Sequence, residues 1–123
     1  MTKNIDVIVI DDDPLVGGLL VHFLEQKLGK NVVFVQEPKE AMKAIRKFRP
    51  EVVLLDWMLS GVSGLDIANK IKRNRYLKNI SVFMISSKCS MEEYEEACLV
   101  DIDAYLTKPL DLKLLSRKMC MQT

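Results

Sequence analysis

The fold is constrained most by four branched apolar residues that run directly into a carboxylate, Val52-Val53-Leu54-Leu55-Asp56. This run follows Pro50, and continuous apolar runs of this length are typical of a parallel strand buried on both faces. In an open α/β sheet, ligands bind at the carboxyl ends of the strands. We therefore expect Asp56 at the ligand-binding edge of a sheet, although a lone Asp at a strand end often only stabilises a turn.

Strand and helix patterns alternate five times along the chain. Strands are predicted over residues 5–10, 31–35, 52–56, 80–86 and 102–107, and each is followed by apolar residues at helical spacing. Pro14 after Asp13, Pro38, and Ser90 with Glu93 as a capping box mark helix starts. The alternation predicts an α/β fold with a parallel sheet, right-handed crossovers and helices on both faces. With no linker or repeat in view, we expect one domain over residues 1–123.

Composition excludes several classes of protein. Lys and Arg number 18 against 17 for Asp and Glu, so the net charge of +1 gives no electrostatic reason to expect nucleic-acid or membrane binding. No signal peptide or bilayer-spanning run is present, and we expect a cytoplasmic protein. The three cysteines, Cys89, Cys98 and Cys120, lack metal-ligand spacing and are expected to be reduced thiols, Cys98 partly turned inward.

Polar residues follow the predicted strands at the point where each strand ends. They are Asp11 and Asp12, Asp56, Ser86 and Lys108. Three carboxylates at one sheet edge cannot all stay ionised unaided, and Mg²⁺, with carboxylate, water and phosphate ligands, would relieve the repulsion. A carboxylate beside such a metal can act as a nucleophile toward phosphorus, while Lys108 and Ser86 neutralise and bind the phosphoryl oxygens.

Structural roles for the same residues stay open. Asp11 to Asp13 contain a helix cap, although one Asp suffices for that purpose. Lys108 could be a solvated strand-end lysine, and Tyr105 could be a packing residue. Trp57 is expected to be half-exposed on the loop after Asp56, and Glu92, Glu93, Glu95 and Glu96 are expected to face solvent on the fourth helix.

As a set, these residues resemble the receiver domain of two-component response regulators over essentially the whole chain. Asp11 and Asp12 match the acidic pair of that family, Asp56 its phospho-acceptor, Ser86 its Ser/Thr position and Lys108-Pro109 its Lys-Pro pair. Tyr105 matches the switch aromatic, and Gly64 matches the glycine that closes the loop after the acceptor. The resemblance implies a flavodoxin-like (βα)5 fold with sheet order 2-1-3-4-5.

The resemblance also implies roles for individual residues. Asp12 and Asp56 would bind Mg²⁺ directly, Asp11 through water, and the backbone carbonyl of Met58 would be a further ligand; Mn²⁺ is an alternative cation. Asp56 would accept a phosphoryl group from a histidine kinase or phosphotransfer protein. Lys108 would pair with the phosphate, and the Lys108-Pro109 peptide would be cis. Ser86 would then move toward the phosphate, and Tyr105 would swing inward into the space that Ser86 leaves. This movement would change the face made by the fourth helix, fifth strand and fifth helix, which would bind an effector.

The chain departs from the family pattern in the loop after Asp56. The family usually has Pro where Ser60 stands and an acidic or polar residue near Ser63, so we expect a more flexible loop. Asp101 stands where the family often has Gly. In the family, the positions of Met58 and Lys88 tune self-dephosphorylation; an apolar residue at 58 cannot orient water, so we expect a long-lived phosphoryl state.

The leading hypothesis is a signalling receiver that phosphorylates and dephosphorylates itself slowly and is otherwise no enzyme. Acidic residues on the fourth helix and Lys113, Arg117 and Lys118 on the fifth suit a homodimer formed on phosphorylation. An aspartyl-phosphate phosphatase would need an Asp at the position of Met58, and a flavin-binding domain would need a phosphate loop without acids after the first strand. A degenerate receiver that serves only as a docking module is the remaining alternative.

Overall fold

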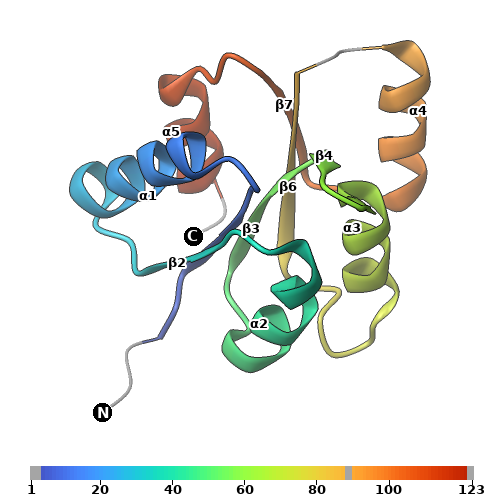
Figure 1. Ribbon diagram of the computed structural model, residues 1–123, viewed down its shortest axis with the longest axis horizontal. Coiled ribbons are helices and arrows are strands. Elements are labelled where there is room, and N and C mark those ends of the chain that lie inside the picture. The colour runs from blue at the N-terminus through green and yellow to red at the C-terminus, as the bar shows by residue number, and fades with distance from the viewer. Residues whose placement is uncertain (1–3, 88–89, 122–123) are drawn as a thin grey trace.

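The structure is a computed structural model that describes residues 4–87 and 90–121. Its central element is a parallel five-stranded sheet with strand order β2-β1-β3-β6-β7, which corresponds to the expected order 2-1-3-4-5 (Figure 1). The strands are β1 (Val7–Ile10), β2 (Val32–Val35), β3 (Val52–Asp56), β6 (Ser81–Ser86) and β7 (Ala104–Thr107). The flavodoxin-like α/β fold predicted from the sequence is confirmed.

Five helices cover the two faces of this sheet. They are α1 (Pro14–Leu28), α2 (Ala41–Phe48), α3 (Gly64–Arg73), α4 (Met91–Val100) and α5 (Leu112–Cys120), with a 3₁₀ turn, η1 (Pro38–Glu40), before α2. Helices α1 and α5 lie on one face, and α2, α3 and α4 lie on the other (Figure 1). The helix expected to begin at Pro38 therefore opens with a 3₁₀ turn, and its α-helical part starts at Ala41.

The central strand β3 is buried on both faces, as its sequence indicates. Val53 and Leu55 pack into the core beneath α2, α3 and α4, whereas Val52 and Leu54 pack into the core beneath α1 and α5. Residues of a strand point alternately to opposite faces, so an uninterrupted apolar run contributes to both cores at once. Asp56 is the last residue of β3 and is still buried.

The segment after Asp56 contains more regular structure than expected. Residues of β4 (Met58–Leu59) and β5 (Val62–Ser63) pair antiparallel, and Gly61 between them has a φ of 75°. Glycine adopts this left-handed conformation without steric cost. The segment for which the sequence analysis expects a loop is therefore a small hairpin that leads directly into α3.

Three side chains lie differently from the sequence prediction. Trp57 is only 7% exposed because its ring packs into the core beneath α2, α3 and α4, so the half-exposed placement is wrong. Glu93 is half-buried and turned toward the sheet instead of facing solvent. Cys98 is exposed, because Ala97 occupies the buried position of that turn of α4.

Two smaller features agree with the sequence. Asp13 caps α1 by accepting a hydrogen bond from the Leu15 backbone N–H, and Ser90 caps α4 by accepting one from the Glu93 N–H. Asp101 has a φ of 66°, a left-handed conformation that explains why glycine suits this position. Among residues 4–87 and 90–121, no helix has both the length and the apolar character needed to cross a bilayer.

Candidate functional site

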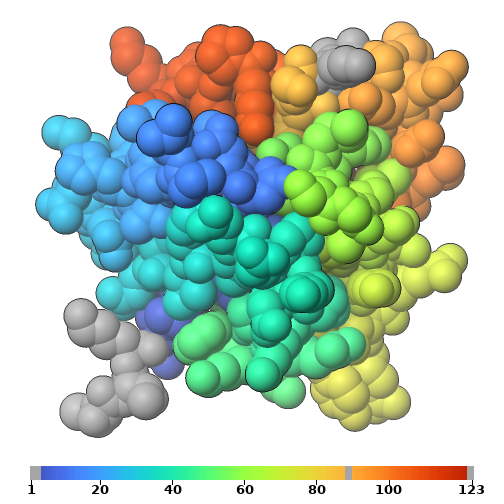
Figure 2. Space-filling view, viewed as in Figure 1, coloured from blue at the N-terminus to red at the C-terminus, as the bar shows by residue number. Residues whose placement is uncertain are grey.

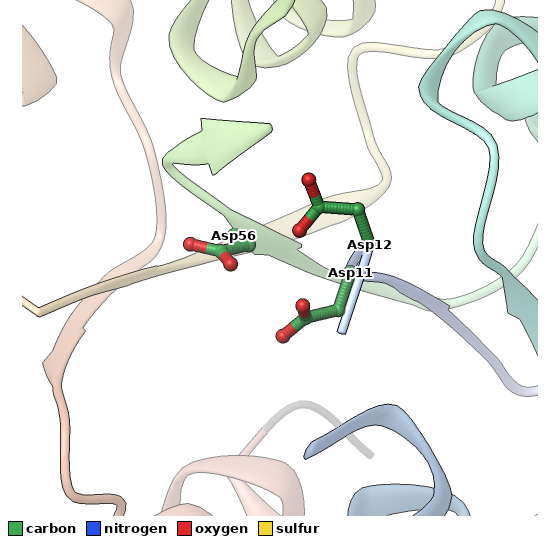
Figure 3. A group of neighbouring side chains, drawn as sticks. All are labelled: Asp11, Asp12 and Asp56. Atoms are coloured by element: carbon green, nitrogen blue, oxygen red, sulfur yellow. The ribbon is translucent and has the colours of Figure 1, made fainter. Parts of the chain in front are cut away.

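Three carboxylates meet at the carboxyl edge of the sheet. Asp11 and Asp12 directly follow β1, and Asp56 ends the neighbouring strand β3, which pairs with β1 in parallel register. One carboxylate oxygen from each of the three lies within 4.8 Å of the others (Figure 3). Residues separated by more than forty positions are thus brought together because parallel strands end at the same edge.

Both carboxylate oxygens of Asp56 are held in place. Oδ1 accepts a hydrogen bond of 3.2 Å from the backbone N–H of Met58, and Oδ2 accepts one of 3.1 Å from the Lys108 ammonium. Lys108 follows β7, and its backbone N–H donates to the carbonyl of Ser86 at 2.8 Å. The peptide between Lys108 and Pro109 is cis. The predicted lysine therefore lies directly against the predicted acceptor.

Asp11 is a buried acid with an unsatisfied oxygen. Among the described residues, its Oδ2 is buried without a hydrogen-bond donor, and Lys108 Nζ lies 3.8 Å from it. Burial, reinforced by the charge of Asp56, raises the pKa of Asp11 to about 6. For Lys108, burial lowers the pKa, but the hydrogen bond and charge of Asp56 outweigh burial and raise it. Lys108 therefore compensates only part of the negative charge at this edge.

Asp12 is held by a residue of the hairpin. Its Oδ2 accepts hydrogen bonds from both the hydroxyl and the backbone N–H of Ser60, at 2.7 and 2.9 Å. Figure 2 shows the green atoms of this part of the chain next to the blue start of α1. The Ser60 hydroxyl lowers the pKa of Asp12. A proline at position 60 could donate neither hydrogen bond.

This donor set fits a hard divalent cation. Such cations bind carboxylate oxygens, and an unsatisfied buried oxygen on Asp11 beside two further carboxylates is the arrangement that bound Mg²⁺ would stabilise. Asp11, Asp12 and Asp56 could therefore hold Mg²⁺. The Met58 side chain is 68% exposed, and its backbone carbonyl stays a predicted ligand.

Gly64 allows the hairpin to close tightly over the acceptor strand. A Cβ atom at this position would lie 2.1 Å from the backbone oxygen of Asp56 and 2.9 Å from the Cα of Trp57. The Gly64 N–H donates to the Trp57 carbonyl at 2.8 Å. The glycine predicted to close this loop is thus required by close backbone approach and not by a positive φ.

The two predicted switch residues lie on β6 and β7, the strands that follow the acceptor strand β3 in the sheet. Ser86 ends β6, is buried, and donates its hydroxyl hydrogen bond to Glu93. Tyr105 of β7 is half-buried, and its ring contacts Trp57 edge-on, with centroids 5.9 Å apart. The structure therefore gathers these residues around the sheet edge that carries Asp56. Lys88, the second predicted kinetics-tuning residue, lies outside the described residues.

Sequence analysis did not identify the roles of Ser60 and Glu93. Ser60 was noted only as a departure from the family pattern, although its two donors are what distinguish it from proline. Glu93 lies four residues before Ala97, whose burial places position 93 on the same inner face of α4. That spacing was the available signal for an inward-facing carboxylate.

Comparison with known proteins assigns the family. The sequence model described as "Response regulator receiver domain" matches residues 7–119. The chain belongs to this family. Receiver domains of two-component response regulators act in phosphorelay signalling, and they bind Mg²⁺ at an acidic pocket.

Individual relatives agree with this assignment. The receiver is 28% identical to the phosphate regulon transcriptional regulatory protein PhoB of Pseudomonas aeruginosa, over 84% of this chain but only 44% of that protein. It is 24% identical to chemotaxis protein CheY-3 of Vibrio cholerae, over 97% of this chain and 92% of that protein. The chain thus spans less than half of the first relative and nearly all of the second.

Solved structures show the same fold. The signal receiver domain of a DNA-binding response regulator from Colwellia psychrerythraea superposes with a TM-score of 0.91 at 24% identity, covering 95% of this chain and 96% of that one. Chemotaxis protein CheY4 of Vibrio cholerae superposes with a TM-score of 0.88 at 21% identity, covering 98% and 100%. At these identities the likeness concerns the fold, and the site residues are argued from their own geometry.

Proposed function

We propose that this receiver accepts a phosphoryl group on Asp56, in a Mg²⁺-dependent reaction, from a histidine kinase or a histidine phosphotransfer protein. The observation that carries the proposal is the contact of 3.1 Å between Lys108 Nζ and Asp56 Oδ2 inside a cluster of three carboxylates. A cap cluster or a solvated lysine would not require the last residue of β3 and the residues that follow β1 and β7 to converge on one point.

In the reaction, a carboxylate oxygen of Asp56 attacks the phosphorus of the donor. A P–O bond forms to Asp56 while the P–N bond to the donor histidine breaks, and the leaving imidazole takes up a proton. The hydrogen bond from the Met58 N–H holds Oδ1, and Lys108 holds Oδ2, so the carboxylate is oriented before the donor arrives.

The residues around Asp56 supply positioning and charge neutralisation. Asp11, Asp12 and Asp56, together with the Met58 carbonyl, would hold the cation, which when bound neutralises the negative charge of the transferring group. Lys108 remains beside Asp56 to pair with a phosphoryl oxygen, and Ser86 supplies a hydroxyl donor at the end of the adjacent strand.

The output follows from the movement of Ser86 and Tyr105. With Ser86 drawn toward the phosphoryl group and Tyr105 turned inward, the face formed by α4, β7 and α5 changes and binds a downstream effector or effector domain. Exposed Glu95 and Glu96 on α4 and exposed Lys113 and Arg117 on α5 supply opposite charges for a homodimer of phosphorylated copies. Sedimentation with beryllofluoride, a phosphoryl mimic, should show dimers, and a strict monomer at high concentration would contradict the dimer.

Incubation with acetyl phosphate tests the proposal directly. Intact mass spectrometry should show one phosphoryl group on the wild-type protein with Mg²⁺, and none after chelation or on Asp56→Asn. Asp66→Asn, which changes an exposed acid at the start of α3, is the matched control and should label like the wild type. Equal labelling of Asp56→Asn and the wild type would refute the assignment of Asp56.

A further inference from the structure

A single carboxylate oxygen joins the two switch residues to helix α4. Glu93 lies in the first turn of α4, and its Oε2 accepts hydrogen bonds from Ser86 Oγ at 3.0 Å and from Tyr105 Oη at 3.1 Å. Ser86 is the last residue of β6, and Tyr105 lies on β7. One oxygen atom of Glu93 therefore connects α4 to both of these strands. Neither contact follows from the capping box expected of Ser90 and Glu93, in which the Glu93 carboxylate would accept a hydrogen bond from the Ser90 backbone N–H.

Two aromatic rings fix the orientation of Tyr105 beside Glu93. Trp57 and Tyr94 each meet the Tyr105 ring edge-on, with centroids 5.9 and 6.2 Å away and interplanar angles of 79° and 84°. Edge-to-face contacts of this kind are favourable. Because the Trp57 ring contacts the Tyr105 ring, a displacement of Tyr105 changes the surroundings of the chain's one tryptophan. Such a displacement can therefore be followed by the fluorescence of Trp57.

We infer that Glu93 is a positioning residue that holds Ser86 and Tyr105 in their unphosphorylated arrangement and thereby limits how readily the domain takes up a phosphoryl group. The inference rests on the proposed function of Asp56. It goes beyond that function because it assigns the resistance to switching to one side chain on α4.

The first step concerns the single hydroxyl proton of Ser86. Ser86 has one O–H donor, so it cannot donate to Glu93 and to a phosphoryl oxygen at the same time. Engagement of Ser86 with the phosphoryl group therefore requires that its bond to Glu93 be broken. An inward movement of Tyr105 breaks the second bond to the same oxygen.

The second step concerns the partial burial of the Glu93 carboxylate. A half-buried carboxylate that loses two hydrogen-bond donors must be solvated again, and hydrogen bonds to ionised acceptors are stronger than those between neutral groups. The unphosphorylated arrangement is therefore favoured over the switched one. A ligand that binds only the switched arrangement therefore has a higher apparent Kd, because only a fraction of the molecules is in that arrangement.

The test compares beryllofluoride binding, in the presence of Mg²⁺, between the wild type and variants at position 93. The apparent Kd, measured from Trp57 fluorescence, should fall about tenfold in Glu93→Ala, since one net charge-assisted hydrogen bond corresponds to about that factor. Glu93→Gln keeps an oxygen that can accept both bonds and should lie closer to the wild type. Glu92→Ala removes the same charge from the same turn of α4, but at an exposed position, and should bind like the wild type.

A second variant keeps the inference testable if Glu93→Ala disturbs the start of α4. Tyr105→Phe removes only the hydroxyl and should also lower the Kd, and its effect should not add to that of Glu93→Ala, because both remove the same contact. Unchanged or weaker binding in folded Glu93→Ala, or in Tyr105→Phe, would overturn the positioning role. Absence of beryllofluoride binding in the wild type would instead refute the proposed function, and the inference with it.

Discussion

Replacing Asp11 with Asn should stabilise the cation-free domain at neutral pH. Asp11 is 2% exposed, its Oδ2 has no donor among the described residues, and burial raises its pKa from 3.8 to about 6. The fold therefore favours the protonated form, and ionised Asp11 opposes folding. Asn keeps an oxygen that can accept the hydrogen bond from the Asp13 N–H, while it removes the charge.

The size of the effect follows from the pKa difference. A pKa of about 6 in the folded state against 3.8 in the unfolded state corresponds to about 3 kcal/mol of lost stability where Asp11 is ionised in both states. The loss is nearly complete above about pH 7, shrinks as folded Asp11 takes up a proton near its pKa of about 6, and vanishes below about pH 4, where Asp11 is protonated in both states. Between pH 7.5 and pH 5, wild type should recover about 1.4 kcal/mol relative to Asp11→Asn.

Urea unfolding followed by Trp57 fluorescence measures this difference. Asp11→Asn should exceed the wild type in unfolding free energy by about 2–3 kcal/mol at pH 7.5, and by about half as much at pH 5. Added Mg²⁺ should stabilise the wild type and have little effect on the variant. Glu25→Gln, which removes an exposed charge from α1, controls for net charge. A less stable Asp11→Asn protein, or a difference independent of pH, would refute this reasoning.

Three further predictions concern the hairpin and its neighbours. Gly64→Ala should lower the unfolding free energy by about 2–3 kcal/mol, because its Cβ would lie 2.1 Å from a backbone oxygen. Gly18→Ala on α1, where the Cβ meets nothing within 4 Å, should instead raise the unfolding free energy by about 0.5–1 kcal/mol. Equal effects of the two substitutions in urea unfolding would contradict this prediction. Ser60→Ala should weaken Mg²⁺ binding about tenfold in calorimetric titration, because it removes the hydroxyl that orients Asp12, and Ser60→Thr should restore it. Met58→Asn should shorten the lifetime of the phosphorylated protein, measured as loss of the added mass after acetyl phosphate is removed, because a polar side chain can orient water; an unchanged lifetime would exclude this mechanism.

The fold and the contents of the sheet edge could be predicted from sequence because both depend on repeated local patterns. The apolar run ending at Asp56 identifies a strand buried on both faces, and parallel strands bring their carboxyl ends to one edge. Asp11, Asp12 and Lys108 therefore had to lie near Asp56 once the alternation of strands and helices was established. This topological argument requires no knowledge of side-chain orientation.

Side-chain orientation around that edge could not be predicted in the same way. Trp57 is buried because its ring packs into the core beneath α2, α3 and α4, which no local pattern indicates. Ser60 and Asp12 lie 48 positions apart, and their contact depends on the hairpin of β4 and β5. Glu93 lies on a helix whose polar residues outnumber its buried ones, so its inward direction depends on donors supplied by β6 and β7.

Localisation of the phosphoryl group is the most direct test of the central claim. After treatment with acetyl phosphate and Mg²⁺, reduction with borohydride converts an aspartyl phosphate to homoserine, which tandem mass spectrometry can place in the sequence. We predict homoserine at position 56, and its absence when Mg²⁺ is chelated. Homoserine at another aspartate, or at position 56 in equal amount without a divalent cation, would contradict the account.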